Sequence, residues 1–198
     1  VLLSSSNHAP YRFPADIPFI PKSTSMPQRM VEYSDWALGE FTAAAMERDW
    51  AKRTLFIYLG DHGASGDYRF HLPISMVHVP LIMTGPDLLA AEKCDDLASQ
   101  LDVMPTVMGQ LGLAYRNLGF GVDLCRERRS LSVFCNDEYL GCTDGEYFVS
   151  FNFDTPGYAG RMNPSRSPGT MALQRIEEMK DTALAYFRMA DWLITEKK

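Results

Sequence analysis

The sequence has little basic charge and no long hydrophobic run. Its 198 residues contain 19 Lys and Arg against 25 Asp and Glu, which gives a net charge of -6. This balance leaves no basic field to bind nucleic-acid phosphates or an anionic membrane surface. The longest apolar runs, such as residues 55–59 and 79–83, have the length of a strand, whereas a membrane-spanning helix needs about 20 residues. Nucleic-acid binding and a bilayer-spanning segment are therefore not expected of these residues.

The four cysteines form no Cys-x-x-Cys pair, which argues against a structural zinc site. Three of them, Cys125, Cys135 and Cys142, lie close together in a polar stretch. The cysteine count alone does not fix the redox compartment. A local disulfide among these three and a set of four free thiols therefore both remain open.

The chain begins with Val-Leu-Leu rather than methionine, and this opening lacks the basic and apolar regions of a signal peptide. The sequence also contains no internal repeat and no low-complexity segment. We therefore expect the chain to be a piece of a longer protein.

With 46% hydrophobic residues, the chain can bury a substantial core. The spacing of these residues predicts three helices and three strands. The helices are expected at residues 28–50, 98–111 and 171–194, and the strands at 54–60, 77–83 and 145–153. Asp102 is expected to cap the second helix, and five prolines make residues 10–27 an extended loop. In the last helix, the side chains expected to face the protein are Ile176, Met179, Leu184, Phe187 and Trp192.

The order of helix, short connection and apolar strand predicts an α/β fold. Residues 55–60 show little polar alternation, which is typical of a parallel strand covered on both faces. We expect a three-layer α/β/α sandwich in which this strand ends at the functional site.

The sharpest local feature is the turn Gly60-Asp61-His62-Gly63, directly after that strand. The carboxyl ends of strands in open parallel sheets line the ligand crevice, and the flanking glycines allow a tight turn. A carboxylate and a neutral imidazole suit Zn²⁺ or Mn²⁺, with further ligands from elsewhere. The turn is therefore predicted to be half of a metal site, and the alternative is an ordinary polar turn.

Three further histidines are candidates for other roles. His8 follows a short apolar run, and His71 lies in a loop beyond His62. Because histidine changes charge near neutral pH, either residue could bind a phosphate or transfer a proton, or simply cap its loop. His78 lies in an apolar segment and is predicted to be a core or rim residue.

Five motifs in a fixed order resemble the sulfatase group of the alkaline phosphatase superfamily. They begin with Ser-Asn-His-Ala-Pro-Tyr and Tyr-Leu-Gly-Asp-His-Gly, and they occupy residues 6–11, 58–63, 78–86, 101–107 and 119–124. Within that superfamily they look most similar to the lipoteichoic acid synthase and phosphoglycerol transferase type. The resemblance implies an alkaline-phosphatase-like α/β/α sandwich, of which residues 1–198 form the C-terminal part of one catalytic domain.

The resemblance implies a metal-dependent enzyme that attacks a phosphate or sulfate ester. Asp61 and His62 match the metal ligands, His8 matches the substrate-binding histidine, and His71 matches a further histidine of the site. The implied metal is a divalent ion, Mn²⁺ or Zn²⁺, with Mg²⁺ or Ca²⁺ as alternatives. The family's nucleophile lies upstream of the segment around His8, and no cysteine here has a Cys-x-Pro-x-Arg context. The fragment alone is therefore expected to be inactive.

The implied reaction is transfer of a phosphoglycerol or phosphoethanolamine group through a covalent phospho-enzyme. One alternative is a sulfatase or phosphatase that passes the group to water, and another is a non-catalytic binding module that has kept the fold. The implied partners are an ester substrate such as a lipid head group or glycan, the upstream half of the domain, and a membrane reached through an upstream anchor. The implied location is extracytoplasmic, in the periplasm or on the outer face of the cell membrane.

Overall fold

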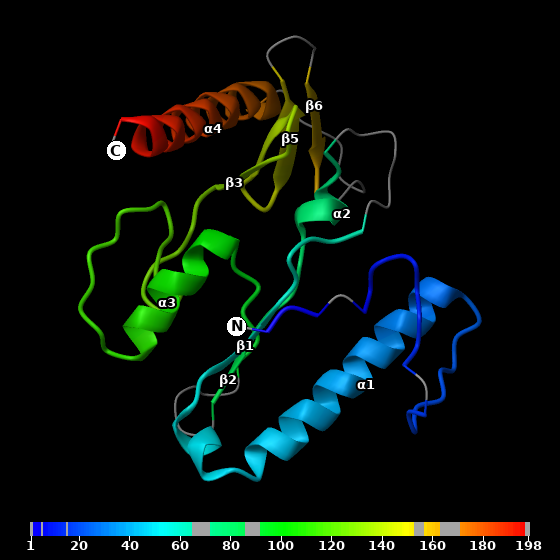
Figure 1. Cartoon of the computed structure of the whole chain (residues 1–198). Coiled ribbons are helices and arrows are strands. Elements are labelled where there is room, and N and C mark those ends of the chain that lie inside the picture. Colours follow the sequence, from blue (N-terminus) through cyan, green and yellow to red (C-terminus); the bar gives the residue numbers. More distant parts are fainter. Residues whose placement is uncertain are drawn as a thin grey trace. The chain divides into compact units, whose positions relative to one another are not determined.

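The computed structural model describes residues 2–4, 6–14, 16–64, 72–85, 92–152, 157–162 and 171–196 (Figure 1). It forms two compact units, residues 1–57 with 83–89 and residues 58–82 with 90–198. None of the described helices is both long and apolar enough to cross a membrane. The helices are α1 (Met26–Met46), α2 (Ile74–Val77), α3 (Val103–Gln110) and α4 (Met171–Thr195), with 3-10 turns η1 (Asp49–Arg53) and η2 (Gln100–Asp102). The strands are β1 (Phe56–Leu59), β2 (Leu81–Thr84), β3 (Ser132–Cys135), β4 (Leu140–Thr143), β5 (Tyr147–Phe151) and β6 (Tyr158–Arg161).

Helix α1 confirms the first predicted helix and organises the first unit. Pro27 lies in its first turn, where the missing N–H has no intrahelical partner to lose. The Glu32 carboxylate accepts the backbone N–H groups of Lys22 and Ser23 at 2.7 and 3.1 Å, and thereby holds the proline-rich loop against the helix. The Ser23 hydroxyl donates to the same carboxylate, and these bonds lower the pKa of Glu32. The end of the loop expected at residues 10–27 is therefore held against α1 at Lys22 and Ser23.

Strands β1 and β2 form a two-stranded sheet. The Gly60 N–H, just after β1, donates to the Pro80 carbonyl oxygen, just before β2, at 3.4 Å. The end of one strand thus lies beside the start of the other, as in an antiparallel pair. Along β1 only Phe56 is buried, whereas Leu59 is exposed. Among the described residues, the neighbour of β1 is therefore an antiparallel strand, and the predicted parallel pairing is not seen. Because Leu59 is exposed, β1 is also not covered on both faces, which differs from the prediction.

A second sheet has the antiparallel order β3-β4-β5-β6, and helix α4 packs against β4 and β5. Cys142 of β4 pairs with Val133 of β3 on one side and with Val149 of β5 on the other. Strand β4 therefore lies in the middle of the hydrophobic face of this sheet. Met179 and Ala183 of α4 complete this core, which also contains Leu131, Leu140, Tyr147 and Phe151. The sequence predicted β5 and α4 but not the other three strands.

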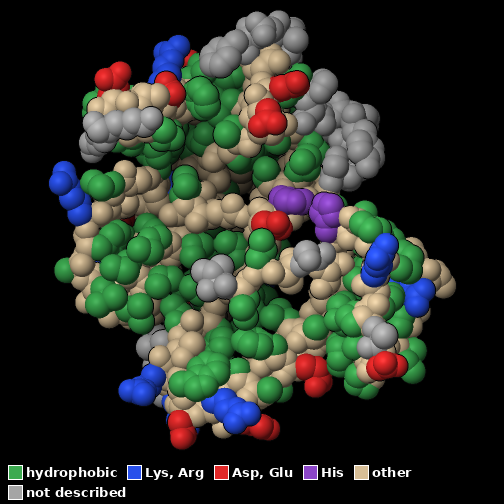
Figure 2. Space-filling model, viewed as in Figure 1, with side chains coloured by type: hydrophobic (Ala, Val, Ile, Leu, Met, Phe, Trp, Pro, Cys, Tyr) green, Lys and Arg blue, Asp and Glu red, His purple; other side chains and the backbone are tan. Residues whose placement is uncertain are grey.

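Hydrophobic side chains form part of the surface in both units (Figure 2). Val31, Leu38 and Phe41 are exposed on α1. On α4, Phe187 and Trp192 are 43% and 50% exposed, so their predicted inward orientation is wrong, whereas Met179 is buried as predicted. Ile176 and Leu184 are partly buried and pack against the core, as predicted.

The predicted helix at residues 98–111 divides into η2 and α3. Ser99 is the N-cap of η2. The Asp102 carboxylate accepts the Ser99 N–H at 2.8 Å, and this bond completes a capping box. The Asp102 side chain does not cap α3. It is fully buried and paired with Arg129, whose Nε donates to Oδ2 at 2.8 Å. Asp102 therefore occupies the predicted N-cap position of α3, but its side chain is a buried counterion and makes no capping bond there.

All four cysteines are free thiols in the structure, so the local disulfide is absent. Cys142 is fully buried, and its Sγ–H donates to the Met179 carbonyl oxygen at 3.6 Å. Cys125 and Cys135 are exposed. Burial raises the pKa of Cys142 to about 12, which keeps this thiol protonated and unreactive.

Candidate metal site

The turn after β1 is held in place by backbone contacts within the second unit. The Gly63 N–H donates to the Met76 carbonyl oxygen at 2.7 Å, which ties the turn to α2. A Cβ at Gly63 would overlap the Ser75 carbonyl oxygen, so only glycine fits this close approach. The turn presents Asp61 and His62 to solvent, with side chains 71% and 69% exposed.

The ring orientation of His62 fixes its tautomer. Nδ1 lies 2.9 Å from the Gly63 carbonyl oxygen, and a carbonyl can only accept, so Nδ1 carries the proton and donates it. The lone pair of the neutral ring is then on Nε2. Metal-binding histidines commonly donate their other ring N–H to a backbone carbonyl in this way. The geometry of His62 is therefore that of a ligand that would bind through Nε2.

The Asp61 carboxylate lies beside that nitrogen. Its Oδ1 accepts the His62 backbone N–H at 2.9 Å, and this bond lowers the pKa of Asp61, so the group is ionised at neutral pH. Its Oδ2 lies 3.9 Å from His62 Nε2. An ionised carboxylate and an imidazole lone pair are thus side by side, which fits a divalent transition metal.

The two groups are a partial ligand set. No group of three or more His, Cys, Asp or Glu suited to a metal occurs among the described residues. Zn²⁺ sites normally use at least three protein ligands. The donor chemistry therefore fits a metal, and the number of donors fits half of a site.

Sequence reasoning missed the contact that supports this turn from outside. Gln100, the first residue of η2, donates through Nε2 to the carbonyl oxygens of Gly60 and Asp61, at 2.8 Å each. Nothing in the local pattern around residue 100 distinguishes this glutamine from a solvated surface residue, because its partners lie about 40 positions earlier.

The other predicted histidines have different outcomes. His8 belongs to the first unit, is exposed, and places Nδ1 2.6 Å from the Ala9 carbonyl oxygen, so its Nε2 also carries the lone pair. His71 lies outside the described residues. His78 caps the C-terminal end of α2 and is exposed, so it is not a core residue. The structure groups Asp61 with His62 and places His8 in a separate unit.

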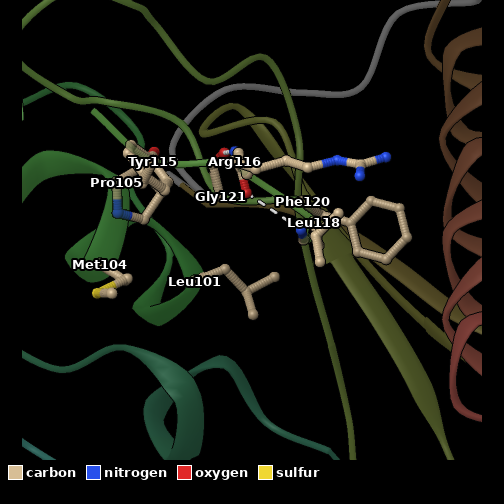
Figure 3. Close-up of a pocket in the computed structure, with 10 residues that line it drawn as sticks. Leu101, Met104, Pro105, Tyr115, Arg116, Leu118, Phe120 and Gly121 are labelled. Atoms are coloured by element: carbon tan, nitrogen blue, oxygen red, sulfur yellow. Dashed lines mark hydrogen bonds between the residues drawn. The ribbon is translucent and has the colours of Figure 1, made fainter. Parts of the chain in front are cut away.

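A cavity of about 260 Å³ lies beside α3, between that helix and the segment 115–121 (Figure 3). Leu101, Met104 and Pro105 line one side, and Asn117 Nδ2 donates to the Gly121 carbonyl oxygen at 2.8 Å on the other. Among the lining residues that the structure describes, Arg116 alone is charged, and Figure 3 shows its guanidinium extending away from Met104 and Pro105. The described lining of this cavity is mostly apolar and contains no histidine, cysteine or carboxylate.

The described helices and strands form an α/β fold, as the sequence predicts. The chain is similar to the solved structure of a protein in the Alkaline Phosphatase Superfamily from Vibrio parahaemolyticus, with a TM-score of 0.75 and 22% identity over 94% of this chain and 48% of that one. It is also similar to Ps i-CgsB, with a TM-score of 0.57 and 14% identity over 80% of this chain and 42% of that chain. At these identities the likeness shows the fold alone.

The Sulfatase family model matches residues 1–113, more than half of the chain, so the chain belongs to the sulfatase family. Its relatives include Arylsulfatase K of Mus musculus, 34% identical over 90 residues, and of Homo sapiens, 33% identical over 89 residues. These alignments cover 43% and 42% of this chain, and only 16% and 17% of the relatives. The family prediction is confirmed. The predicted closeness to lipoteichoic acid synthases is not.

Proposed function

We propose that this chain is the metal-binding C-terminal part, residues 1–198, of one sulfatase-type catalytic domain that hydrolyses sulfate esters. The observation that carries the proposal is the pairing of Asp61 Oδ2 with His62 Nε2 at 3.9 Å, with the His62 tautomer fixed by Gly63. Both residues lie within the part that matches the sulfatase family. Similarity to Arylsulfatase K favours sulfate as the group that is transferred.

Asp61 and His62 would hold one divalent ion, Mn²⁺ or Zn²⁺, with Mg²⁺ or Ca²⁺ as alternatives. When bound, such an ion neutralises negative charge on the ester oxygens and favours the ionised form of the nucleophile. The chain itself supplies a carboxylate that stays charged and an imidazole whose Nδ1–H donates to the Gly63 carbonyl oxygen, which keeps the ring in the ligating orientation. The remaining ligands and the nucleophile would come from the upstream half of the domain.

His8 would act on the substrate rather than on the metal. Its Nδ1–H is engaged by the Ala9 carbonyl oxygen, so Nε2 is the atom left to bind an ester oxygen. When protonated at Nε2, it would donate this proton to the leaving alkoxide, a step that positioned histidines accelerate by about 10²–10⁴-fold. His71 would assist at the same site, as the family resemblance implies.

Transfer of a phosphoglycerol or phosphoethanolamine group through a phospho-enzyme is the second candidate, favoured by the five ordered motifs. The upstream nucleophile separates the two: a threonine favours transfer, and a cysteine followed by Pro or Ser and then Arg favours sulfate hydrolysis. A non-catalytic module with the same fold is a third candidate, which absence of metal binding would favour.

The proposed partners follow from the same argument. Val31, Leu38 and Phe41 give α1 an exposed apolar surface, and the chain covers 48% of a superfamily structure. We propose that the upstream half of the domain covers this surface. The substrate is a sulfate or phosphate ester of a glycan or lipid head group, and the location is extracytoplasmic, with a membrane anchor upstream.

The test uses the full-length protein and its Asp61→Ala and His62→Ala variants. We expect each variant to lose bound metal and hydrolysis of a nitrophenyl sulfate together, since each removes one of two adjacent ligands. His78→Ala is the matched control, because His78 is an exposed histidine of the same unit. His8→Ala should keep the metal and lose rate by about 10²-fold or more. Full activity in Asp61→Ala would contradict the proposal, and preference for phosphodiesters would favour group transfer.

A further inference from the structure

Gln100 links η2 to the candidate metal turn. Resting on the function proposed above, we propose that Gln100 is a positioning residue that sets the backbone from which Asp61 reaches the metal. Its side chain does not contact the carboxylate or the imidazole. It contacts the peptide groups that carry them.

The two hydrogen bonds of Gln100 constrain the backbone on both sides of Asp61. One amide group donates one proton to the Gly60 carbonyl oxygen and the other to the Asp61 carbonyl oxygen, both at 2.8 Å. These carbonyls belong to the peptide planes before and after the Asp61 Cα. Fixing both planes fixes the direction in which Asp61 leaves the backbone, although its side chain is 71% exposed.

Gln100 is itself held by a buried network. Ser99 caps η2, and its Oγ accepts the Leu101 N–H at 3.3 Å while its N–H donates to Asp102. Asp102 is fully buried, accepts the Val122 N–H at 2.8 Å and is paired with Arg129. A flexible glutamine is therefore presented from a short turn that is anchored in the core.

The chemistry of the amide is specific at this position. Two carbonyl oxygens converge on one point, and only a group with two protons satisfies both. Alanine would leave this point to water, and glutamate would place a third oxygen acceptor against two others. Supporting groups of this kind typically change metal affinity by about 10–100-fold when removed.

The experiment measures Mn²⁺ affinity of the full-length protein by calorimetric titration. We expect Gln100→Ala to bind about 10–100-fold more weakly than wild type, and Gln100→Glu to bind at least as weakly as Gln100→Ala. Gln174→Ala is the matched control, because Gln174 is exposed on α4 and donates to Glu178 at 2.9 Å, a contact unrelated to the turn. The control should match wild type.

Two further readouts separate positioning from general stability. The unfolding temperature of metal-free Gln100→Ala should equal that of the control, and saturating Mn²⁺ should restore most of its turnover. Wild-type metal affinity in Gln100→Ala, alongside lost binding in Asp61→Ala, would overturn the role of Gln100 and leave the site standing. Wild-type affinity in Asp61→Ala would overturn the site and this inference with it.

Discussion

Replacing Arg129 with methionine tests the contribution of the buried ion pair to stability. The side chains of Arg129 and Asp102 are 3% and 0% exposed. The guanidinium donates through Nε to Asp102 Oδ2 and through a terminal nitrogen to Oδ1, and Asp102 holds the pKa of Arg129 above its usual range. Methionine keeps an apolar stem of similar length but removes every donor. The substitution therefore isolates the polar part of the interaction.

The expected loss in the free energy of unfolding follows from the polar groups that lose Arg129 as a partner. Asp102 keeps two amide donors, Ser99 N–H and Val122 N–H, each at 2.8 Å, but its charge is then uncompensated in the core. The carbonyl oxygens of Phe120 and Leu131 also lose donors, at 2.8 and 3.1 Å. Removing one partner of a buried pair costs about 3–5 kcal/mol. We expect Arg129→Met to lower the free energy of unfolding by that amount.

Urea denaturation followed by circular dichroism gives the measurement. Arg128→Met is the matched control, because Arg128 is 83% exposed and pairs with Asp96 at 2.8 Å, a surface contact that contributes about 0–1 kcal/mol. The double variant Asp102→Leu with Arg129→Met should recover part of the loss, since no unpaired charge remains. An Arg129→Met variant as stable as Arg128→Met would refute the reasoning.

Two further predictions concern a close approach and a buried thiol. Gly63→Ala should lose metal binding and about 1–3 kcal/mol of stability, because its Cβ would overlap the Ser75 carbonyl oxygen. Gly39→Ala, in α1 with nothing within 4 Å of its new Cβ, should raise stability by about 0.5–1 kcal/mol, and a melting curve showing equal effects of the two substitutions would contradict the turn geometry. In Ellman titration at pH 8, the three exposed cysteines should react in the folded protein and Cys142 only after unfolding, since burial raises its pKa to about 12. Fast reaction of all four would show that Cys142 is not in the core.

The sequence predicted the elements whose signal is local. Periodic apolar residues identified α1 and α4, and an unbroken apolar run identified β1. Strand β4 was missed because its four residues, Leu-Gly-Cys-Thr, have no alternation and contain a glycine. Its stability comes from pairing with β3 and β5 and from the α4 side chains above it, which are contacts between distant parts of the chain.

The candidate site shows the same difference between local signals and contacts between distant parts of the chain. Asp61 and His62 could be predicted as a candidate pair because they are adjacent in the chain and follow a strand. Gln100 acts on carbonyl oxygens about 40 residues earlier, so no spacing reveals it. Asp102 was identified as a helix start but not as a buried acid, since the arginine that neutralises it is one of three between residues 126 and 129.

Arg129 also connects two segments of the second unit, the η2 turn and the segment that leads into β3. Asp102 lies within the segment that matches the sulfatase family, residues 1–113, and Arg129 lies beyond it. A buried carboxylate without its counterion is unfavourable, so the η2 turn needs the segment that leads into β3. Gln100 belongs to η2 and donates to the backbone of the candidate metal turn, and Arg129 precedes Leu131 of the β3–β6 core by two residues. The segment that leads into the C-terminal sheet is therefore connected to the candidate metal turn through two interactions, the Arg129–Asp102 ion pair and the Gln100 amide.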